Sequence, residues 1–374
     1  MKRPTEKTME KSPYWSKRIS ELEPYTPGEQ PRDRRYIKLN TNESPYPPSP
    51  KVLEAIRAAA NEDLRLYPDP TCFVLRSAIA ARYGLPGADW VFVGNGSDEI
   101  LAFAFAAFFG PRDRTERQPL LFPDITYSFY PVYADLWNIE YETVPVTEKF
   151  EIDTAHYRRP ASGVVLANPN APTGRALGKG ALIDLVAFHQ QEQNVVLIDE
   201  AYVDFGAESM ADQVQRYDNL LVVHTLSKSR SLAGLRVGYA LGQPDLIEGL
   251  RRVKDSFNSY TLDRLALAGA QAAIENREYY DAMAAKIAAT RENTRRALEE
   301  AGFEVIPSAA NFIFIRHPER SGAELFQELR SRGILVRHWN KPRISEYLRV
   351  SIGTDEEMES FVRICRDIIE RSQG

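Results

Sequence analysis

Short apolar runs alternate with segments of helical pattern through the first two thirds of the chain. Residues 163–167 and 195–198 are runs of strand length, rich in valine and other branched side chains, and residues 177–191 between them have a helical pattern. Two further runs of strand length follow at residues 220–224 and 236–241. Such runs separated by helices predict a mainly parallel sheet covered on both faces. Ligands of these sheets bind at the carboxyl ends of the strands.

The preceding segment continues this alternation towards the N-terminus. Residues 24–50 are rich in proline and polar side chains, which predicts an extended arm with little regular structure. After the arm, the pattern predicts three helices and one short strand. The helices are expected at residues 50–61, 74–83 and 97–109, and the strand at residues 90–93.

The pattern changes after Gln243. Residues 244–253 and 262–301 read as long helices, and short strands interleaved with two more helices follow them. This predicts a second, smaller α/β domain. The strands are expected at residues 303–306, 311–315, 334–336 and 347–352, and the helices at residues 321–332 and 355–371.

Composition narrows the class of protein. Of 374 residues, 43% are apolar and 26% charged, as in soluble globular proteins. The net charge of −5 does not indicate nucleic-acid binding. Cys72 and Cys365, the two cysteines, form no disulfide framework or metal-ligand spacing. Residues 1–20 lack the apolar centre of a signal peptide, and the longest apolar run, residues 100–109, is too short to span a bilayer. We therefore expect a cytoplasmic protein without metal, membrane or nucleic-acid partner.

Two turns lie where such a sheet places its ligands. Gly94-Asn95-Gly96-Ser97-Asp98-Glu99 follows a predicted strand and opens a helix, so its glycines permit a tight turn and the helix start offers free backbone N–H groups to an anion. A plain helix N-cap at Ser97 or Asp98 would also explain it. Asn168 to Gly174 directly follows a predicted strand and has the same two interpretations, ligand turn or ordinary loop.

Two ionisable side chains follow apolar strands. Asp199 ends one of them, and a buried carboxylate is costly unless it is paired. A protonated pyridine nitrogen is one partner that would pair it. The alternative is a helix-capping or metal-binding aspartate, but no nearby cluster of histidines supports a metal. Lys228 follows Thr225-Leu226-Ser227 after the next strand. A lysine amine can form an imine, and the later Arg236 supplies a permanent cation for a phosphate. In isolation Lys228 would also fit an ordinary solvated lysine.

The order and spacing of these features resemble the fold-type I aminotransferases of class I/II, from about Tyr25 to Arg371. Within that class the chain is similar to the histidinol-phosphate aminotransferase family. The resemblance implies a mainly parallel seven-stranded sheet in a large domain (51–265) and a smaller α/β domain (266–374), which the arm (1–50) joins in part. The stretches that carry the family resemblance are LNTNESPY (39–46), RLYPD (65–69), residues 225–238 and YLRVSIGT (347–354).

The resemblance implies pyridoxal 5′-phosphate as cofactor and assigns its contacts. Lys228 would bind it as a Schiff base and act as general base and acid. Asp199 would keep the pyridine nitrogen protonated, which makes the ring an electron sink. Tyr202 would bond the phenolic oxygen, and Tyr127 would stack on the ring unless it is ordinary core packing. The phosphate-binding groups would be the backbone N–H groups of Ser97 and Asp98, the hydroxyls of Thr225 and Ser227, and Arg236.

The substrate contacts are also implied by the resemblance. Arg349 matches the arginine that binds the acidic end of the substrate, and Arg337 would add a second cation that suits a phosphate, unless it is a surface cation. Tyr67 would reach the phosphate of the cofactor from the other subunit, which implies a homodimer with shared active sites. The remaining substrate-side residues would be Tyr25, Asn42 and Asn311.

One position departs from the family pattern. An asparagine often precedes Pro-Thr-Gly and binds the phenolic oxygen of the cofactor, but this chain has Ala171 there. Alanine cannot donate that hydrogen bond. Asn170, one residue earlier, is a candidate substitute, and Tyr202 acting with a water molecule is the other.

The function that the resemblance implies is reversible amino transfer between L-histidinol phosphate and 2-oxoglutarate, in histidine biosynthesis. Its partners would be a small-molecule amino donor and a 2-oxoacid. An aromatic amino-acid aminotransferase is the main alternative. A threonine-phosphate decarboxylase is a second, although the chain lacks the His-Gly-Gly-Asn stretch of those relatives. A cofactor-binding module without turnover is a third alternative. The presence of Lys228, Asp199, Tyr202 and Arg236 disfavours it.

Overall fold

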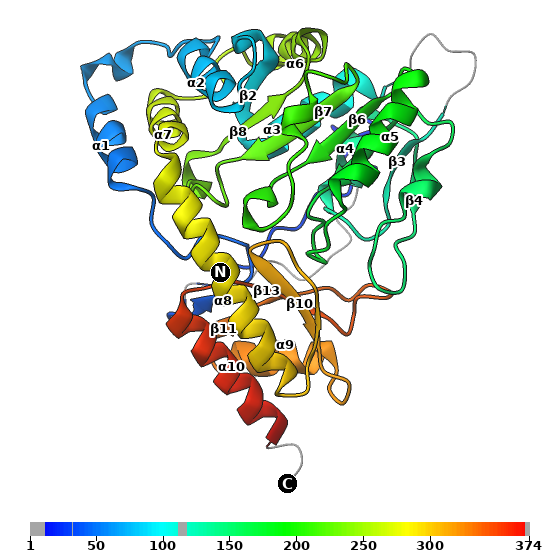
Figure 1. The fold of residues 1–374 in the computed structure, drawn as a ribbon, viewed down its shortest axis with the longest axis vertical. Coiled ribbons are helices and arrows are strands. Elements are labelled where there is room, and N and C mark those ends of the chain that lie inside the picture. Colours follow the sequence, from blue (N-terminus) through cyan, green and yellow to red (C-terminus); the bar gives the residue numbers. More distant parts are fainter. Residues whose placement is uncertain (1–11, 32, 111–117, 371–374) are drawn as a thin grey trace.

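The computed structural model describes residues 12–31, 33–110 and 118–370, and Figure 1 shows a large upper part built on a twisted sheet and a smaller lower part. The large sheet has seven strands in the order β2-β8-β7-β6-β5-β3-β4. Its strands are β2 (Val91–Asn95), β3 (Leu120–Pro123), β4 (Tyr141–Val144), β5 (Gly163–Ala167), β6 (Val195–Asp199), β7 (Leu220–Thr225) and β8 (Val237–Leu241).

The strand directions match the predicted fold class. β8 runs antiparallel to both of its neighbours, β2 and β7, while the pairs from β7 to β4 are parallel. Every residue of β5, β6, β7 and β8 is buried, as expected for a sheet with both faces covered. The mainly parallel seven-stranded sheet of an α/β protein is therefore confirmed.

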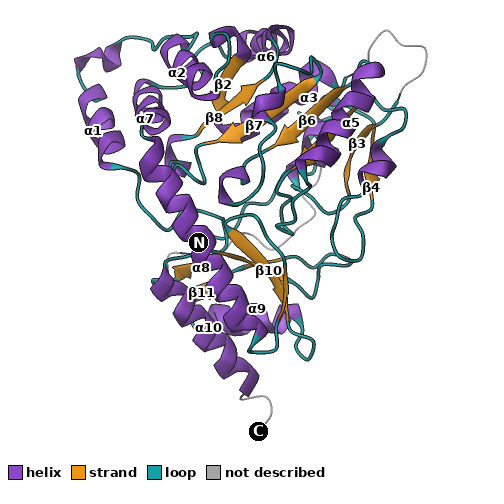
Figure 2. Cartoon of the chain, viewed as in Figure 1, coloured by secondary structure: helices purple, strands orange, loops and turns teal. Residues whose placement is uncertain are grey.

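Helices cover the two faces of this sheet, and Figure 2 shows them in purple around the orange strands. One apolar cluster joins one face to α3 (Gly96–Phe108), α4 (Phe129–Trp137) and α6 (Pro244–Phe257). A second cluster covers the other face. Its helices are α1 (Pro50–Ala59), α2 (Phe73–Tyr83), α5 (Lys179–Gln191) and α7 (Arg264–Glu275).

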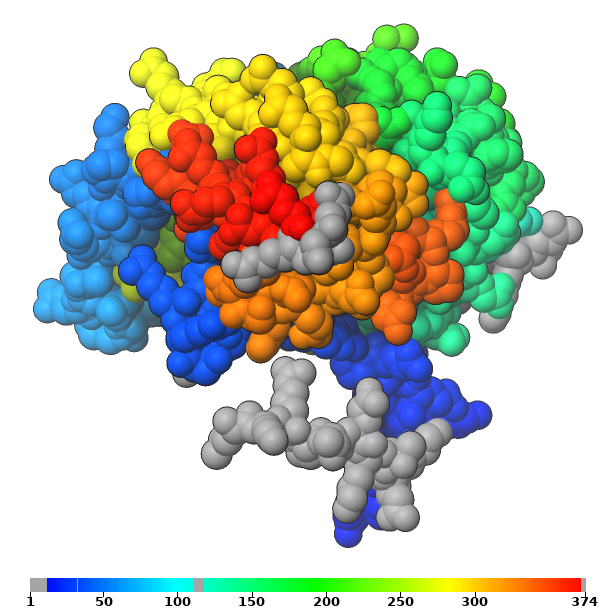
Figure 3. Space-filling view, turned by 90° about the horizontal axis from the view of Figure 1, so that it is seen from below, coloured from blue at the N-terminus to red at the C-terminus, as the bar shows by residue number. Residues whose placement is uncertain are grey.

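The smaller part is built on a second, antiparallel sheet in the order β12-β13-β10-β9. Three helices pack around a cluster that Leu39 of the N-terminal arm enters. Figure 3 shows the last helix in red beside the yellow and orange segments of the other two, and the arm in dark blue projecting from the body. The elements are β9 (Glu304–Ile306), β10 (Phe312–Arg316), β12 (Arg337–His338), β13 (Leu348–Ser351), α8 (Arg277–Glu299), α9 (Gly322–Ser331) and α10 (Asp355–Glu370).

The arm joins the smaller part through main-chain pairing. β1 (Ile37–Lys38) lies parallel to β11 (Ile334–Leu335). Apart from β1, the described arm has no helix or strand until α1 begins at Pro50, as predicted. The domain boundaries at residues 50 and 265 stay a prediction. Residues 1–11 of the predicted arm and Arg371 of the last predicted helix lie outside the described residues.

Three elements of the large part were not predicted. β3 has only four residues, and β4 exposes its first three side chains at the sheet edge, so neither has a long apolar run. α4 lies between them and carries Tyr130, which contacts the active-site region.

None of the helices that the structure describes is long and apolar enough to cross a membrane.

Candidate active site

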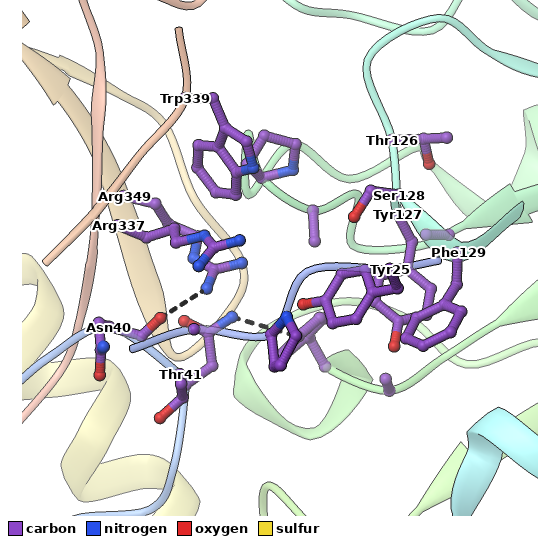
Figure 4. A pocket seen from close by; sticks show the side chains of 18 of the residues that line it. Tyr25, Asn40, Thr41, Thr126, Tyr127, Ser128, Phe129, Arg337, Trp339 and Arg349 are labelled. Atoms are coloured by element: carbon purple, nitrogen blue, oxygen red, sulfur yellow. Dashed lines mark hydrogen bonds between the residues drawn. The ribbon is translucent and has the colours of Figure 1, made fainter. Parts of the chain in front are cut away.

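A cavity of 730 Å³ lies at the carboxyl ends of the parallel strands. Its wall combines the arm, the strand ends of the large sheet and the β12–β13 region of the small sheet, and Figure 4 shows part of it from close by. Thirteen of the predicted site residues line it: Tyr25, Asn42, Ser97, Asp98, Tyr127, Asp199, Tyr202, Thr225, Ser227, Lys228, Arg236, Arg337 and Arg349.

One end of the cavity is an anion-binding cradle at the start of α3. The N-cap of α3 is Asn95, and its side chain makes no capping hydrogen bond, so the first N–H groups of the helix remain for a ligand. The guanidinium of Arg236 donates to Asp98 Oδ2 at 2.9 Å and to Ser227 Oγ at 3.3 Å. The hydroxyls of Thr225 and Ser227 lie 3.0 Å apart beside it. The guanidinium cation, the two hydroxyls and the N–H groups at the helix start together form a site that suits a phosphate.

Asp199 lies at the end of β6, in the wall of the cavity. It is 5% exposed, and the hydroxyl of Tyr130 donates to Oδ2 at 3.0 Å while the backbone N–H of Ala201 donates to Oδ1 at 3.2 Å. Burial raises the pKa of this carboxyl to about 6, although the hydrogen bond from Tyr130 opposes the rise. A cation placed against Asp199 would remove the cost of keeping the carboxylate charged.

Lys228 supplies an amine to the wall of the cavity. Nζ donates to the carbonyl oxygen of Thr41 at 3.2 Å and lies 5.8 Å from the centre of the Tyr202 ring. The arm therefore holds the amine by one neutral hydrogen bond, which leaves the other N–H bonds of Nζ for a ligand.

Two tyrosines line the cavity together with the lysine. Tyr127 donates to Asp98 Oδ1 at 2.7 Å, and burial raises the pKa of the Tyr127 phenol well above its usual value. Tyr202 accepts a hydrogen bond from Asn42 Nδ2 at 3.0 Å. Asn311 donates to the carbonyl oxygen of Asn42 at 3.0 Å, so the asparagine pair fixes the position of Tyr202 rather than contacting the cavity twice.

The opposite end of the cavity is strongly cationic. Arg349 donates to the carbonyl oxygen of Asn40 at 3.0 Å, and Arg337 donates to that of Thr26 at 3.1 Å. The buried Nε of Arg349 has no hydrogen-bond partner in the described part of the chain, and burial lowers the pKa of its guanidinium. Lys341 and Arg343 also line the cavity, although Arg343 is paired with Asp124. This end is suited to bind an anionic substrate group.

Three predicted site residues lie outside the cavity wall. Asn170 is fully buried and uses both ends of its amide, since Thr126 donates to Oδ1 and Nδ2 donates to the carbonyl oxygen of Ile125, both at 2.8 Å. Ala171 lines the cavity in its place, so Asn170 does not substitute for the missing asparagine side chain. Asn311 is the second, and it acts through Asn42 as described above. Tyr67 is the third; it is 79% exposed and stacks on Tyr260 with a ring-centre distance of 4.7 Å.

Sequence reasoning missed several residues of the site. Tyr130 lies in the first turn of α4 and contacts Asp199, and it was missed because α4 itself was not predicted. Trp339 and Arg343 lie in the segment between β12 and β13, and no pattern of the sequence placed that segment at the cavity.

Comparison with known proteins agrees with this geometry. The profile of the family described as aminotransferase class I and II matches residues 34–364. The chain belongs to this family. A histidinol-phosphate aminotransferase of Acetobacter pasteurianus is 54% identical over 96% of this chain and 98% of its own length. A protein of the same name from Clostridium beijerinckii is 52% identical over 97% of this chain and 99% of its own length.

The solved structure of a relative has the same fold as this chain. The histidinol-phosphate aminotransferase of Sinorhizobium meliloti, in complex with pyridoxal 5′-phosphate, superimposes with a TM-score of 0.78 at 27% identity. The match covers 91% of this chain and 93% of that one. The fold-type I assignment and the aminotransferase class expected from the motifs are therefore confirmed.

Proposed function

We propose that this aminotransferase moves an amino group reversibly between L-histidinol phosphate and 2-oxoglutarate, with pyridoxal 5′-phosphate as cofactor. The observation that carries the choice of substrate is the pair Arg337 and Arg349, which faces the cavity opposite the anion cradle. Two arginines suit a phosphate ester, whereas a single arginine suffices for a carboxylate. The relatives that are 54% and 52% identical over nearly the whole chain carry the name of this activity.

The donor set of the cavity fits the cofactor. The cradle of Ser97, Thr225, Ser227 and Arg236 would hold the phosphate, and the buried carboxylate of Asp199 offers the partner that a protonated pyridine nitrogen needs. Lys228 would supply the amine that bonds to the cofactor. When bound, pyridoxal phosphate supplies an electron sink for the carbanion formed at the amino-bearing carbon of the substrate.

The proton transfer is assigned to Nζ of Lys228. With cofactor and substrate bound, Nζ would act as the general base that takes the proton from the amino-bearing carbon and as the general acid that gives it back to complete the proton shift of amino transfer. The carbonyl oxygen of Thr41 orients the amine for this role through the hydrogen bond of 3.2 Å.

The aromatic residues orient the reaction and exclude water. Tyr127 would lie against the face of the cofactor ring, held in place by its hydrogen bond to Asp98. Tyr202, positioned by Asn42, would donate to the phenolic oxygen. Because Ala171 has no hydrogen-bonding side chain, Tyr202 carries this contact without the usual asparagine.

Tyr67 supports a homodimer with shared active sites. Its hydroxyl lies on a surface rich in exposed apolar side chains, and such patches are typical of protein interfaces. We therefore propose that Tyr67 reaches the cofactor phosphate of the partner subunit. We also propose that the protein is cytoplasmic. Tyr260 stacks on Tyr67, and other exposed apolar residues of the chain segments that carry these two tyrosines are Leu64, Leu66, Phe73, Val74 and Phe257.

A steady-state comparison of amino donors tests the proposed substrate. With 2-oxoglutarate as acceptor, L-histidinol phosphate should give a kcat/KM at least tenfold above those of phenylalanine and tyrosine, because a second charge-assisted contact contributes about 1.5–3 kcal/mol. A higher kcat/KM for the aromatic amino acids would make the protein an aromatic aminotransferase. Carbon dioxide release without a 2-oxoacid would make it a decarboxylase.

A further inference from the structure

The small sheet brings two like charges face to face. Arg337 of β12 is directly paired with Arg349 of β13. Side chains of directly paired residues lie on the same face of an antiparallel pair, and like charges at such positions repel. Both arginines line the cavity, so the repulsion is present where the substrate binds. Some feature of the protein must keep the two guanidiniums together before an anion arrives.

Trp339 contacts both guanidiniums. Its ring centre lies 5.4 Å from Cζ of Arg337 and 5.2 Å from Cζ of Arg349, and Figure 4 shows the indole next to the two arginines. Trp339 follows Arg337 by two residues, so an extended chain places the two side chains on the same side, while His338 points to the other side and contacts Phe326. The negative face of an indole attracts a cation, and tryptophan does this better than other aromatic residues.

Arg349 is confined further by a second ring and by the main chain. Its Cζ lies 5.4 Å from the ring centre of Phe312 as well, and its Nη2 donates to the carbonyl oxygen of Asn40. Among the described residues, Arg337 has no such second ring; besides Trp339, it is held by its hydrogen bond to Thr26 in the arm. Arg337 therefore depends on Trp339 more than Arg349 does.

We propose that Trp339 is a positioning residue, which holds Arg337 beside Arg349 and so creates a two-arginine subsite for the phosphate of the substrate. This inference rests on the proposed function and deepens it, because it names the residue that sets the preference for a phosphorylated donor. Without the indole, repulsion turns Arg337 towards solvent, and the subsite keeps the single arginine that a carboxylate needs.

Replacement of Trp339 tests this role in the holoenzyme. Trp339→Leu keeps an apolar side chain but removes the aromatic face, so KM for L-histidinol phosphate should rise about tenfold, the size of a partly desolvated cation–π contact. Its kcat should stay close to that of the wild type, because Trp339 does not touch the reacting atoms. Trp339→Phe should recover part of the affinity. Trp137→Leu, at the end of α4 outside the cavity, is the matched control and should change neither constant.

Binding of inorganic phosphate to the holoenzyme gives a second readout that does not depend on turnover. The cofactor fills the cradle at α3, so calorimetric titration with phosphate reports on the arginine pair. The wild type and Trp137→Leu should bind phosphate equally, Trp339→Phe more weakly, and Trp339→Leu about tenfold more weakly than the wild type. Equal affinity of Trp339→Leu and the wild type would overturn the inference, as would a wild type that binds no phosphate.

The two proposals fail in different ways. If the wild type does not convert L-histidinol phosphate, the proposed substrate is wrong whatever Trp339 does. If the wild type converts it but Trp339→Leu shows unchanged KM and phosphate affinity, only the role of Trp339 is wrong. A loss of kcat with unchanged KM would also contradict a positioning role.

Discussion

At the scale of single residues, the site depends on groups whose charge is costly until a ligand arrives. Asp199 is a buried carboxylate without a cation in contact among its described hydrogen-bond partners, and Arg349 is a buried guanidinium with an unsatisfied Nε. Each has an opposite charge to gain, from the pyridine nitrogen and from the substrate. Both buried charges are therefore unfavourable in the ligand-free protein, and binding of the oppositely charged group relieves that cost and so contributes to ligand affinity.

Asp199→Asn should reveal this cost in the cofactor-free protein. Burial raises the pKa of Asp199 from 3.8 to about 6, so the group stabilises the fold fully below pH 3.8 and loses that contribution as the pH rises through 6. The variant has no such loss. The free energy of unfolding, measured in urea, should therefore change in favour of the variant: the difference between variant and wild type should increase by up to about 3 kcal/mol from pH 4 to pH 7. A difference that stays constant across this pH range would show that Asp199 does not titrate there.

At the scale of elements, two glycines allow β8 and α3 to build the phosphate cradle. Gly96 has φ +76°, and a Cβ there would lie 2.5 Å from Nη2 of Arg236. A Cβ on Gly238 would lie 2.6 Å from the backbone nitrogen of Ser97. The backbones of the helix start and the strand approach so closely that Gly238 accepts no side chain, whereas a side chain at Gly96 would have to adopt a left-handed backbone and displace the guanidinium of Arg236. The cradle geometry thus follows from backbone packing.

Gly96→Ala should weaken the cradle. The left-handed backbone costs a non-glycine residue about 1 kcal/mol, and Arg236 must also move away from the new methyl group. We expect a lower melting temperature and several-fold weaker retention of the cofactor in dialysis. Gly234→Ala is the control, because a Cβ there meets nothing within 4 Å although the residue lies two positions before Arg236. Equal cofactor retention in both variants would contradict this account of the cradle.

The elements that sequence predicted are those with unambiguous patterns. β5, β6 and β7 each begin with an apolar run. Asp199 ends β6 and Lys228 follows the end of β7 by three residues, so both could be predicted from these runs. β4 escaped because a sheet-edge strand exposes Tyr141 to Thr143. The choice between Asn170 and Ala171 depended on which of two adjacent side chains faces the cavity, and loop backbone geometry decides that. Trp339 and Arg343 became visible only through the long-range packing of β12 and β13.

At the scale of the whole molecule, the two sheets meet across the cavity and are joined at its mouth. Arg343, between β12 and β13, donates to Asp124 Oδ2 at 2.8 Å. The same side chain donates to the carbonyl oxygens of Val146 and Thr147 at 2.7 and 3.0 Å. Asp124 directly follows β3 of the large sheet, so this one arginine connects the small part to the large part. The connection fixes the segment that carries Trp339 and Lys341.

Arg343→Met should loosen that connection. Loss of the ion pair and of two hydrogen bonds should lower the free energy of unfolding by about 1–3 kcal/mol and speed proteolytic cleavage in residues 339–344. KM for the donor should rise because Arg337 and Arg349 lie in the two strands that flank this segment. Glu142→Gln breaks the exposed pair of Glu142 and Arg159 and serves as control, with little expected change. Unchanged cleavage in Arg343→Met would argue against a connecting role.

The shared active site can be tested with hybrid dimers. Co-expression of Lys228→Ala and Tyr67→Phe chains with different tags gives a hybrid in which one site has an intact Lys228 and an intact Tyr67 from the partner. That site should retain wild-type cofactor affinity, while the Tyr67→Phe homodimer binds pyridoxal phosphate several-fold more weakly, as expected for one lost charge-assisted hydrogen bond. Hybrid sites with the affinity of the Tyr67→Phe homodimer would place Tyr67 in its own subunit's site or in neither.

Single-turnover absorbance spectroscopy tests the central role of Lys228 most directly. When L-histidinol phosphate is added to the wild-type holoenzyme without 2-oxoglutarate, the absorbance of the lysine-bound cofactor should give way to that of its amine form, and 2-oxoglutarate should reverse the change. Lys228→Ala should still bind the cofactor through the phosphate cradle but should not complete this conversion. A Lys228→Ala protein that converts the cofactor at the wild-type rate would contradict the assignment of Lys228 as the catalytic base.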